Sequence, residues 1–523
     1  MAQTSSSAKI PQDKPAPSLT KGGKLPLLSY FGYGAGDMAN NMVFSLVLSF
    51  LPLYFTDVAG ISPAMVGTIF LVMRFIDGFT DIAAGSVVDR TQTKWGKFRP
   101  FILIFSVPLV VSAVLLFSMP ASMRGTDAAF WWGVGFYFLV GSVFYTLVNI
   151  PYGSLAAAMT QQSNERSRLA TFRSVGSTIM QIALAFLIAP MAQKHKGDPD
   201  ALQSSFTMIV VILGIIAIVF YIFTVMTAKE RVYRTVEQVN FKDAFKVILK
   251  NDALIKLCIV SVVVLTGSFG MMGMALYFNR DVLGNAGFQG WSTLMLSLPV
   301  LIFGGLIPAL VKRIGKRGIF SGAAAIAGIG SVMLYFAPEG AYIYAAIAYF
   351  ILGMSNIVNL IVWNLEADTI EYGELKGGLR TEGTTYAFFS FARKLAQSLG
   401  GFLGLQIIGW FNYDGTLAQQ TDETIHGIRL ATALIPAILF FAGAALIWWF
   451  PINEKRHASI VKELDVRHAA FAKAGISESL KRSDPQGTEG KEMPYPTDTQ
   501  ANRILGSEES RINIVDPTSK SKD

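Results

Sequence analysis

Residues 74–81 read Arg-Phe-Ile-Asp-Gly-Phe-Thr-Asp and lie inside an apolar segment that runs from about Ser62 to Val88. Asp77 and Asp81 are four residues apart, so a helix places both carboxylates on one face, one turn apart. The segment is long enough to cross a bilayer. Each ionisable group at such depth costs about 2.5–3.5 kcal/mol on insertion scales, so these charges need partners.

The cluster of Arg74, Asp77 and Asp81 has two interpretations. A bound cation, sodium if it is a metal ion, would neutralise the adjacent carboxylates, because hard cations prefer oxygen ligands. Alternatively, the three side chains form a structural ion-pair cluster that holds helices together. We favour a transport site, because ionisable groups inside a membrane generally mark function.

The composition predicts a polytopic protein embedded in a lipid bilayer. Of 523 residues, 52% are hydrophobic and 15% are charged, whereas a soluble domain carries about 25% charged residues. We assign the net charge of +8 to cytoplasmic loops rather than to a nucleic-acid partner. The four histidines fall outside the predicted spans and no hydrolase motif is present, so we expect neither an enzyme nor a cofactor.

Twelve apolar segments are long enough to span a bilayer, at about 20 residues each. They run approximately over 26–55, 62–88, 100–119, 130–158, 169–191, 205–227, 254–279, 289–311, 318–337, 342–365, 384–411 and 428–450. The predicted fold class is therefore an all-α membrane protein with twelve transmembrane helices in two six-helix bundles.

A charged segment divides these spans into six and six. The expected parts are an N-terminal tail (1–25), a first bundle (26–227), a linker (228–253), a second bundle (254–450) and a C-terminal tail (451–523). We expect both tails to be largely disordered, apart from a short amphipathic helix over 454–474. Matched basic loops follow spans 2 and 8, which is typical of transporters whose site lies between two repeats.

The loop charges predict an orientation in an inner or plasma membrane. Lysines and arginines concentrate in the 2–3, 4–5, 8–9 and 10–11 loops. By the positive-inside rule, both termini are cytoplasmic. We also expect the basic 2–3 and 8–9 loops to latch the two halves together by pairing with acids such as Glu371 or Glu374.

Polar residues from four spans share one depth. At about 1.5 Å per residue from the cytoplasmic ends, four of them fall near the midplane: Asp37, Asp77, Asn149 and Lys394. Asp81 lies one turn lower and Arg173 lower still. Scattered packing residues would not be expected to coincide in this way, so we expect a shared site. Tyr145 and Thr146 taken alone favour interhelical packing.

Six stretches carry a resemblance to a known family. They are Tyr33-Gly-Ala-Gly-Asp37, Tyr54-Phe-Thr-Asp-Val, residues 74–81, Trp95-Gly-Lys-Phe-Arg-Pro, Tyr145-Thr-Leu-Val-Asn-Ile-Pro-Tyr and Ala367-Asp-Thr-Ile-Glu-Tyr-Gly-Glu. Over residues 26–450 the chain resembles the glycoside–pentoside–hexuronide:cation symporters, the group of the melibiose permease, within the major facilitator superfamily.

The resemblance implies roles for individual residues. Asp77 and Asp81 match cation-site carboxylates, and Thr146 matches a cation-site hydroxyl. Asp37 and Arg173 match ligands of sugar hydroxyls. Lys394 matches a lysine near the cation site, and we group it with Arg74 as a coupling residue. Tyr145 and Lys394 are also candidates for contact with the substrate.

Three departures limit what the resemblance carries over. Asn149 stands where the melibiose permease has a second sugar-binding aspartate, and Gly153 stands where it has a tryptophan. Thr80, also a candidate cation ligand, replaces an asparagine. Galactoside specificity is therefore not transferred, and sodium and proton remain open as coupling ions. The lower negative charge at Asn149 makes an anionic sugar such as a hexuronide tolerable, while a neutral glycoside or pentoside is favoured at least as much.

The sequence thus predicts a cation-coupled sugar symporter of a glycoside, pentoside or hexuronide, functional as a monomer and working by alternating access. Two alternatives remain. One is a transporter of another cargo, such as a lysolipid, on a related scaffold. The other is a non-transporting sugar sensor that signals through its tail.

Overall fold

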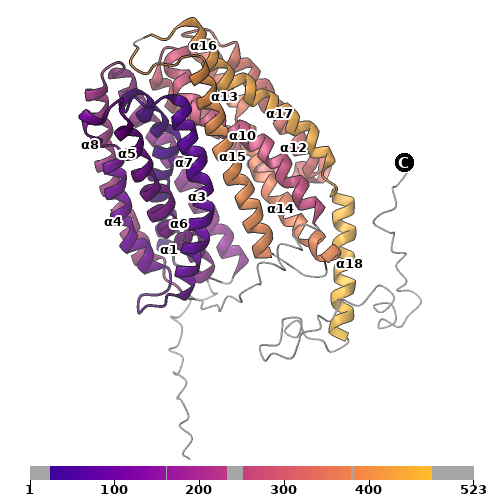
Figure 1. Cartoon of the computed structure of the whole chain (residues 1–523). Helices are drawn as coiled ribbons and strands as arrows, with labels where there is room; N and C mark the ends of the chain where they lie inside the picture. The colour runs from indigo at the N-terminus through magenta and orange to yellow at the C-terminus, as the bar shows by residue number, and fades with distance from the viewer. Residues whose placement is uncertain (1–23, 161, 232–250, 378–381, 418, 474–523) are drawn as a thin grey trace, which may run out of the picture.

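The computed structural model describes residues 24–160, 162–231, 251–377, 382–417 and 419–473, and within these ranges the regular structure is helical. Two groups of long helices stand side by side, one from each half of the chain (Figure 1). Most of the predicted N-terminal tail, of the predicted linker and of the predicted C-terminal tail lies outside the described residues.

The N-terminal half contains six long helical segments. Its elements are α1 (Leu27–Ser45) continuing through η1 (Leu46–Phe50), α2 (Leu51–Leu53) and η2 (Tyr54–Val58); α3 (Pro63–Arg90); α4 (Arg99–Leu116); η3 (Ala121–Met123); α5 (Asp127–Tyr137) continuing through η4 (Phe138–Tyr145) into α6 (Thr146–Met159); α7 (Ser163–Lys194); and α8 (Pro199–Thr227).

The C-terminal half follows the same plan and ends in an extra helix. Its elements are α10 (Asp252–Tyr277) with η5 (Phe278–Val282), η6 (Ala286–Phe288), α11 (Gln289–Phe303), η7 (Gly304–Leu306), α12 (Ile307–Tyr335), α13 (Tyr342–Leu352), α14 (Ser355–Gly377), α15 (Glu382–Trp410), α16 (Asp422–Arg429), η8 (Leu430–Leu434), α17 (Ile435–Leu446), η9 (Ile447–Trp449) and α18 (Glu454–Lys473).

These helices are consistent with the predicted twelve spans. Nine segments of the described chain are long and apolar enough to cross a membrane by length and composition. One of them, Ala286–Tyr335, has 50 residues and is interrupted at η7 and at Gly315, whose φ of 74° breaks the helix. It therefore holds two predicted spans. The long helices α3 and α15 are not among the nine, and they carry the charged residues of the candidate site.

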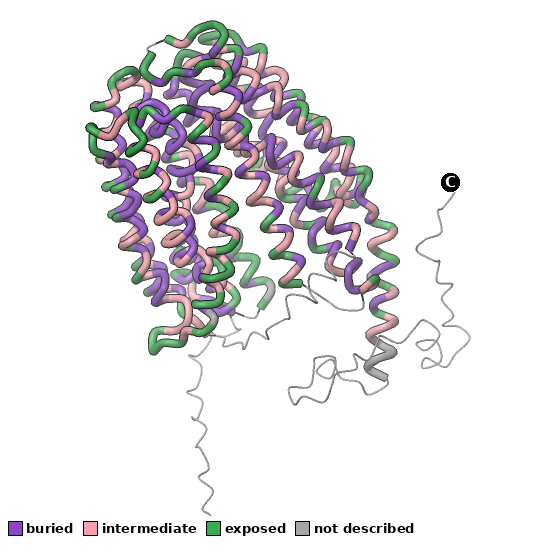
Figure 2. Tube along the Cα trace, in the orientation of Figure 1, coloured by how far each residue is buried: buried purple, intermediate pink, exposed green. Residues whose placement is uncertain are grey.

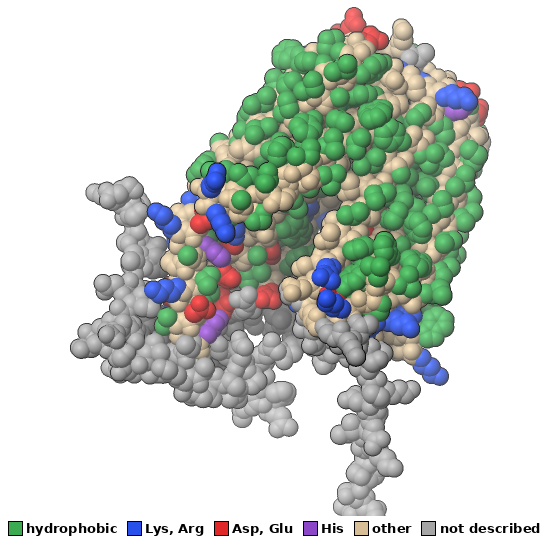
Figure 3. All heavy atoms as spheres, turned by 180° about the vertical axis from the view of Figure 1, so that it is seen from behind, with side chains coloured by type: hydrophobic (Ala, Val, Ile, Leu, Met, Phe, Trp, Pro, Cys, Tyr) green, Lys and Arg blue, Asp and Glu red, His purple; other side chains and the backbone are tan. Residues whose placement is uncertain are grey.

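Burial follows the membrane pattern rather than that of a soluble protein. Buried residues face the interior of each half, and exposed ones lie outward (Figure 2). Much of the outer surface is apolar, and charged side chains gather toward one end (Figure 3). Large apolar side chains such as Ile343 (80% exposed) and Trp410 (74% exposed) lie on it. Such a surface is stable against lipid, so the protein is an integral membrane protein.

The end that carries α18 and the basic 2–3 loop is called here the basic-loop end, and the opposite one the far end. In the 2–3 loop, the Lys97 and Phe98 amides each donate to Glu230 at 2.8 Å. Gly96 has a φ of +110°, and a Cβ there would collide with Glu230. Glycine is thus required for this tight carboxylate cap.

The expected latch between the halves is wrong for this structure. In the 8–9 loop, Lys316 Nζ lies 2.6 Å from Asp368 of its own half. Glu371 and Glu374 lie instead against α18, with His457 Nε2 at 2.6 Å and His468 Nε2 at 2.8 Å respectively. The reason is that α18 docks on α14 and contacts both acids, while a cleft separates the halves at this end (Figure 3).

Candidate functional site

The site is assembled where α3 of the first half packs along α15 of the second. Small residues allow this approach. A Cβ added to Gly67 would lie 3.2 Å from the Phe402 carbonyl oxygen, and one on Gly409 would lie 3.3 Å from the Ala64 amide nitrogen. Close backbone contact through small residues is the usual way that membrane helices associate. It brings the charged faces of α3 and α15 together.

Each carboxylate of the aspartate pair has its own cation. Arg74 Nη1 lies 3.1 Å from Asp77 Oδ2, one turn apart on α3. Lys394 Nζ contacts Asp81 Oδ2 across the boundary between the halves. The pairs differ in exposure: the Asp77 side chain is 6% exposed, whereas Asp81 and Lys394 are 30% and 29% exposed. Asp81 is therefore the carboxylate that an entering ion reaches more easily.

Two hydroxyl groups complete this cluster from the neighbouring η4–α6 segment. Thr146 Oγ1 donates to Asp81 Oδ1 at 3.1 Å, and the Ser142 hydroxyl donates to Asp77 Oδ1. Ser142 was not predicted from the sequence. Its spacing of four from Thr146 matches the spacing of the two aspartates, which is the signal that would have indicated it. Ser142 lies in a π-helical stretch, a feature frequent at functional sites.

Thr80 lies differently from the other candidate cation ligands. Its hydroxyl donates to backbone carbonyls of its own helix, at 3.2 Å to Asp77 O and 3.3 Å to Ile76 O. The Thr80 hydroxyl therefore donates to its own helix and not to the carboxylates. Within the described residues, no group of three or more His, Cys, Asp or Glu side chains gathers as a metal site. The donor set is two carboxylates with two hydroxyls, which suits a hard monovalent ion or a proton.

A second cluster surrounds Asp37 on α1. Arg173 Nε of α7 lies 2.9 Å from Asp37 Oδ1, and the Arg173 guanidinium lies 5.5 Å from the Tyr152 ring centre. Asn41 Nδ2 donates to Asp37 Oδ2 at 3.0 Å. Gln181 Nε2 donates in turn to Asn41 Oδ1 at 3.3 Å. These contacts hold a carboxylate, an amide and a guanidinium together on the inner face of the first half.

The remaining substrate candidates lie on η4 and α6. The Tyr145 ring stacks on Phe44 with a 6.4 Å centroid distance. Asn149 is partly buried, and its side chain makes no hydrogen bond to another described residue. A Cβ at Gly153 would meet nothing within 4 Å. The Asn149 amide and the space beside Gly153 are therefore available to a ligand.

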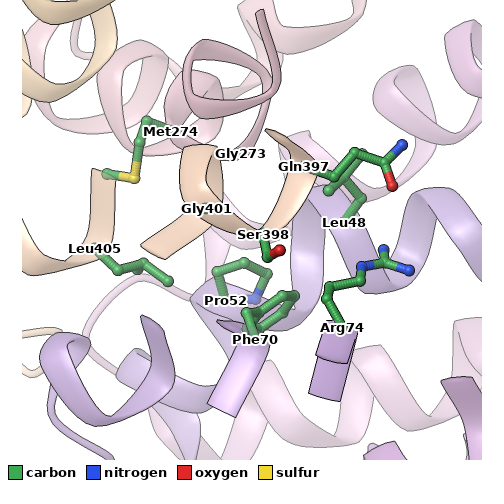
Figure 4. A pocket seen from close by; sticks show the side chains of 10 residues that line it. All are labelled: Leu48, Pro52, Phe70, Arg74, Gly273, Met274, Gln397, Ser398, Gly401 and Leu405. Atoms are coloured by element: carbon green, nitrogen blue, oxygen red, sulfur yellow. The ribbon is translucent and has the colours of Figure 1, made fainter. Parts of the chain in front are cut away.

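Among the described residues, two cavities between the halves bear on the site. The smaller, of about 10 Å³, is lined by Arg74, Phe70, Pro52, Gln397 and Ser398 among others (Figure 4); at that size it holds at most one water. The larger, of about 120 Å³, has walls from both halves and is rich in hydroxyl and amide groups. Gln181 lines it from the first half and Asn359 from the second.

The far end is closed by buried charges that sequence reasoning missed. Arg280 of η5 contacts Asp57 of η2, and both side chains are at most 3% exposed. Lys196 Nζ lies 2.6 Å from Asp281, and the Tyr413 hydroxyl donates to Asp57 at 3.0 Å. In the sequence these charges resemble ordinary residues of short loops. These pairs join the halves at the far end, whereas a cleft separates them at the basic-loop end.

Comparison with known proteins agrees with this architecture. The family model described as MFS/sugar transport protein matches residues 32–454.

The chain belongs to this family of the major facilitator superfamily.

Among its relatives is the glucuronide carrier protein homolog of Escherichia coli (strain K12), 36% identical over 443 residues, which cover 83% of this chain and 95% of the relative. The isoprimeverose transporter of Lactiplantibacillus pentosus is 28% identical over 89% of this chain and 97% of its own length. The crystal structure of the nucleoside transporter NupG aligns with a TM-score of 0.57 at 14% identity, covering 80% of this chain and 99% of NupG.

These matches confirm the family and the two-bundle fold predicted from the sequence. The NupG likeness supports the fold alone because its identity is low. In this transporter family, the clusters between the halves lie where an alternating-access carrier binds its cargo.

Proposed function

We propose that the protein is a secondary active transporter that couples sugar movement to a sodium or proton gradient. The contact between Lys394 and Asp81 carries the proposal, because it joins the two halves through the residues expected to bind the cation. The family assignment supports transport of a sugar. Relatives named for glucuronide and for isoprimeverose support the same class of substrate.

Coupling follows from competition for Asp81. In the arrangement described, the Lys394 ammonium neutralises this carboxylate across the boundary. A sodium ion or proton that binds at Asp81 replaces the ammonium, with oxygens of Asp77, Thr146 and Ser142 nearby. Releasing Lys394 removes one link between α3 and α15. Cation occupancy therefore changes the relative energy of the arrangements of the two halves, as alternating access requires.

The proposed sugar site is the Asp37 cluster. A carboxylate accepts from two hydroxyls, a guanidinium donates to a sugar oxygen, and the Asn149 amide does both. Side-chain hydrogen bonds connect Asp37 through Asn41 to Gln181, which lines the larger cavity between the halves. A sugar held there contacts both halves, so its binding is sensitive to their relative position.

The orientation and assembly complete the proposal. By the positive-inside rule, the basic loops support a cytoplasmic location for the basic-loop end and both termini, with the site opening inward. Each chain contains both halves and the clusters between them, which supports function as a monomer in an inner or plasma membrane.

A screen of radiolabelled sugars in membrane vesicles tests the proposal. Sodium and proton gradients are imposed separately, and accumulation is compared with vesicles lacking the protein. We expect at least one glycoside, pentoside or hexuronide to accumulate under one of the two ion gradients. Its accumulation should stop when that ion gradient is collapsed. Gradient-independent equilibration of every sugar would contradict the coupling, and competition by lysolipid headgroups instead of sugars would contradict the substrate class.

A further inference from the structure

One cation between the halves differs from the others. Three cation–carboxylate pairs belong to the candidate site: Arg74–Asp77, Lys394–Asp81 and Arg173–Asp37. Arg393 of α15 is partly buried and forms no ion pair within the described residues. Its Nη1 donates to Asn359 Oδ1 of α14 at 2.7 Å. An amide oxygen orients a guanidinium but does not neutralise it, so this positive charge is uncompensated.

Arg393 lies at the depth of the coupling site but faces elsewhere. It precedes Lys394 on α15, so the two differ by about 1.5 Å in height and about 100° in direction. Lys394 turns to α3, and Arg393 turns to α14. Asn359, its partner, lines the larger cavity between the halves. The positive charge is thus held next to Asn359, a residue of the cavity wall formed by the second half.

The guanidinium is oriented by an aromatic face. Its central carbon lies 4.8 Å from the centre of the Trp363 ring, one turn along α14 from Asn359. Trp363 is itself held by stacking on Tyr386, with 5.5 Å between ring centres and 22° between planes. The other N–H groups of Arg393 have no partner among the described residues, yet none is sealed from solvent. The guanidinium is planar, its face lies against Trp363, and its remaining N–H donors are free. Such a group fits an anionic group with two or more oxygens.

We infer that Arg393, oriented by Asn359 and Trp363, binds the anionic group of the substrate, and that the substrate is a sugar bearing a carboxylate or a sulfonate. The inference rests on the sugar transport proposed above and names the class within it. The sugar hydroxyls then lie toward Asp37 and Asn41 of the first half, and the anion toward the second. The bound anion supplies the counter-charge that Arg393 lacks, which makes recognition favourable at this partly buried guanidinium.

Calorimetry on the purified full-length protein tests this specificity. The probes are matched pairs of a uronide and its neutral parent glycoside, with a sulfonated sugar as a third arm. We expect wild-type protein to prefer an anionic member. Arg393→Gln should lower the affinity for that anion roughly 10- to 100-fold, the range for losing a charge-assisted hydrogen-bonded contact, and should leave the neutral partner's affinity unchanged. The sulfonate arm shows which anion fits better.

Two further variants make the result decisive. Arg393→Lys keeps the charge without the planar fork and should retain a reduced preference for the anion. Arg90→Gln removes an exposed arginine from the end of α3 and should change neither affinity. If Arg393→Gln lost affinity equally for anionic and neutral sugars, or if wild-type protein preferred neutral sugars, the inference would be overturned while sugar transport stayed intact. Binding of no sugar by wild-type protein would overturn the proposed function itself.

Discussion

The ammonium of Lys394 on α15 contacts the carboxylate of Asp81 on α3, so opposite charges join the two halves of the protein. Neither residue has a second ion-pair partner among the described residues. Whatever binds at Asp81 must therefore displace the contact between the halves.

Lys394 should set the cation dependence of transport. Removing it as Lys394→Ala leaves Asp81 uncompensated. The cost should fall below the roughly 3–5 kcal/mol typical of a fully buried pair, because both side chains are about 30% exposed. We expect strongly impaired uptake and a shifted dependence on sodium or pH, measured as initial rates in vesicles. Lys394→Arg, which keeps the charge, is the control; wild-type rates for Lys394→Ala at every sodium concentration and pH would refute this role.

Asp37 should be required for sugar binding but not for cation binding. It accepts hydrogen bonds from Arg173 and Asn41, and Asp37→Ala removes the acceptor that the sugar hydroxyls need. Calorimetry should show sugar affinity lost while cation binding remains measurable. Asp200→Ala removes an aspartate whose side chain is 81% exposed and should leave both unchanged. An unaltered sugar affinity in Asp37→Ala would place the sugar elsewhere.

Asp57 should hold the far end closed. Its pair with Arg280 is buried, and breaking buried pairs typically costs about 3–5 kcal/mol. Because Asp281 still partners Arg280, we expect Asp57→Asn to open this end at least about tenfold more often, which corresponds to about 1.4 kcal/mol.

Alkylation of a cysteine in the larger cavity reports this opening. The variant is Ser49→Cys in a Cys258→Ala background, labelled by an impermeant maleimide from the far side. Asp200→Asn breaks an exposed pair at the same end, worth little, and is the matched control. Equal labelling rates with and without Asp57→Asn would mean that the pair is not a gate.

The C-terminal tail should be dispensable for transport. Deleting 474–523 leaves α18 in place, whereas deleting 455–523 removes its buried Ile460 and Leu464. We expect sugar uptake by both truncated proteins, with a lower unfolding midpoint for the longer deletion alone. The sensor alternative would be favoured if the full-length protein showed no sugar uptake and if truncation abolished a cellular response to sugar.

The sequence predicts spans well because their apolar content is local. The second span was expected over 62–88, and α3 covers Pro63–Arg90. Depth counting along the helices anticipated that Lys394 and the aspartate pair are neighbours, since rise per residue is fixed. The direction in which a side chain points around its helix axis cannot be counted from the sequence in this way. The side to which Ser142 and Arg393 turn depends on π-helical register and on packing between distant helices.

The charges at the far end show the same limit. Asp57 and Arg280 are 223 residues apart in sequence, and each lies where loop charges are common. Only the approach of the two halves makes them a buried pair. The predicted latch failed for a similar reason, because α18 folds back against α14 and contacts Glu371 and Glu374.

The central claim is that cation binding at Asp77 and Asp81 drives sugar accumulation. The most direct test compares wild-type protein with Asp77→Asn and Asp81→Asn, which remove one charge at nearly constant size, in vesicles with an imposed sodium or proton gradient. The account predicts that both variants lose accumulation against a sugar gradient, while exchange of internal for external sugar can persist. Accumulation at the wild-type level in both variants would contradict it.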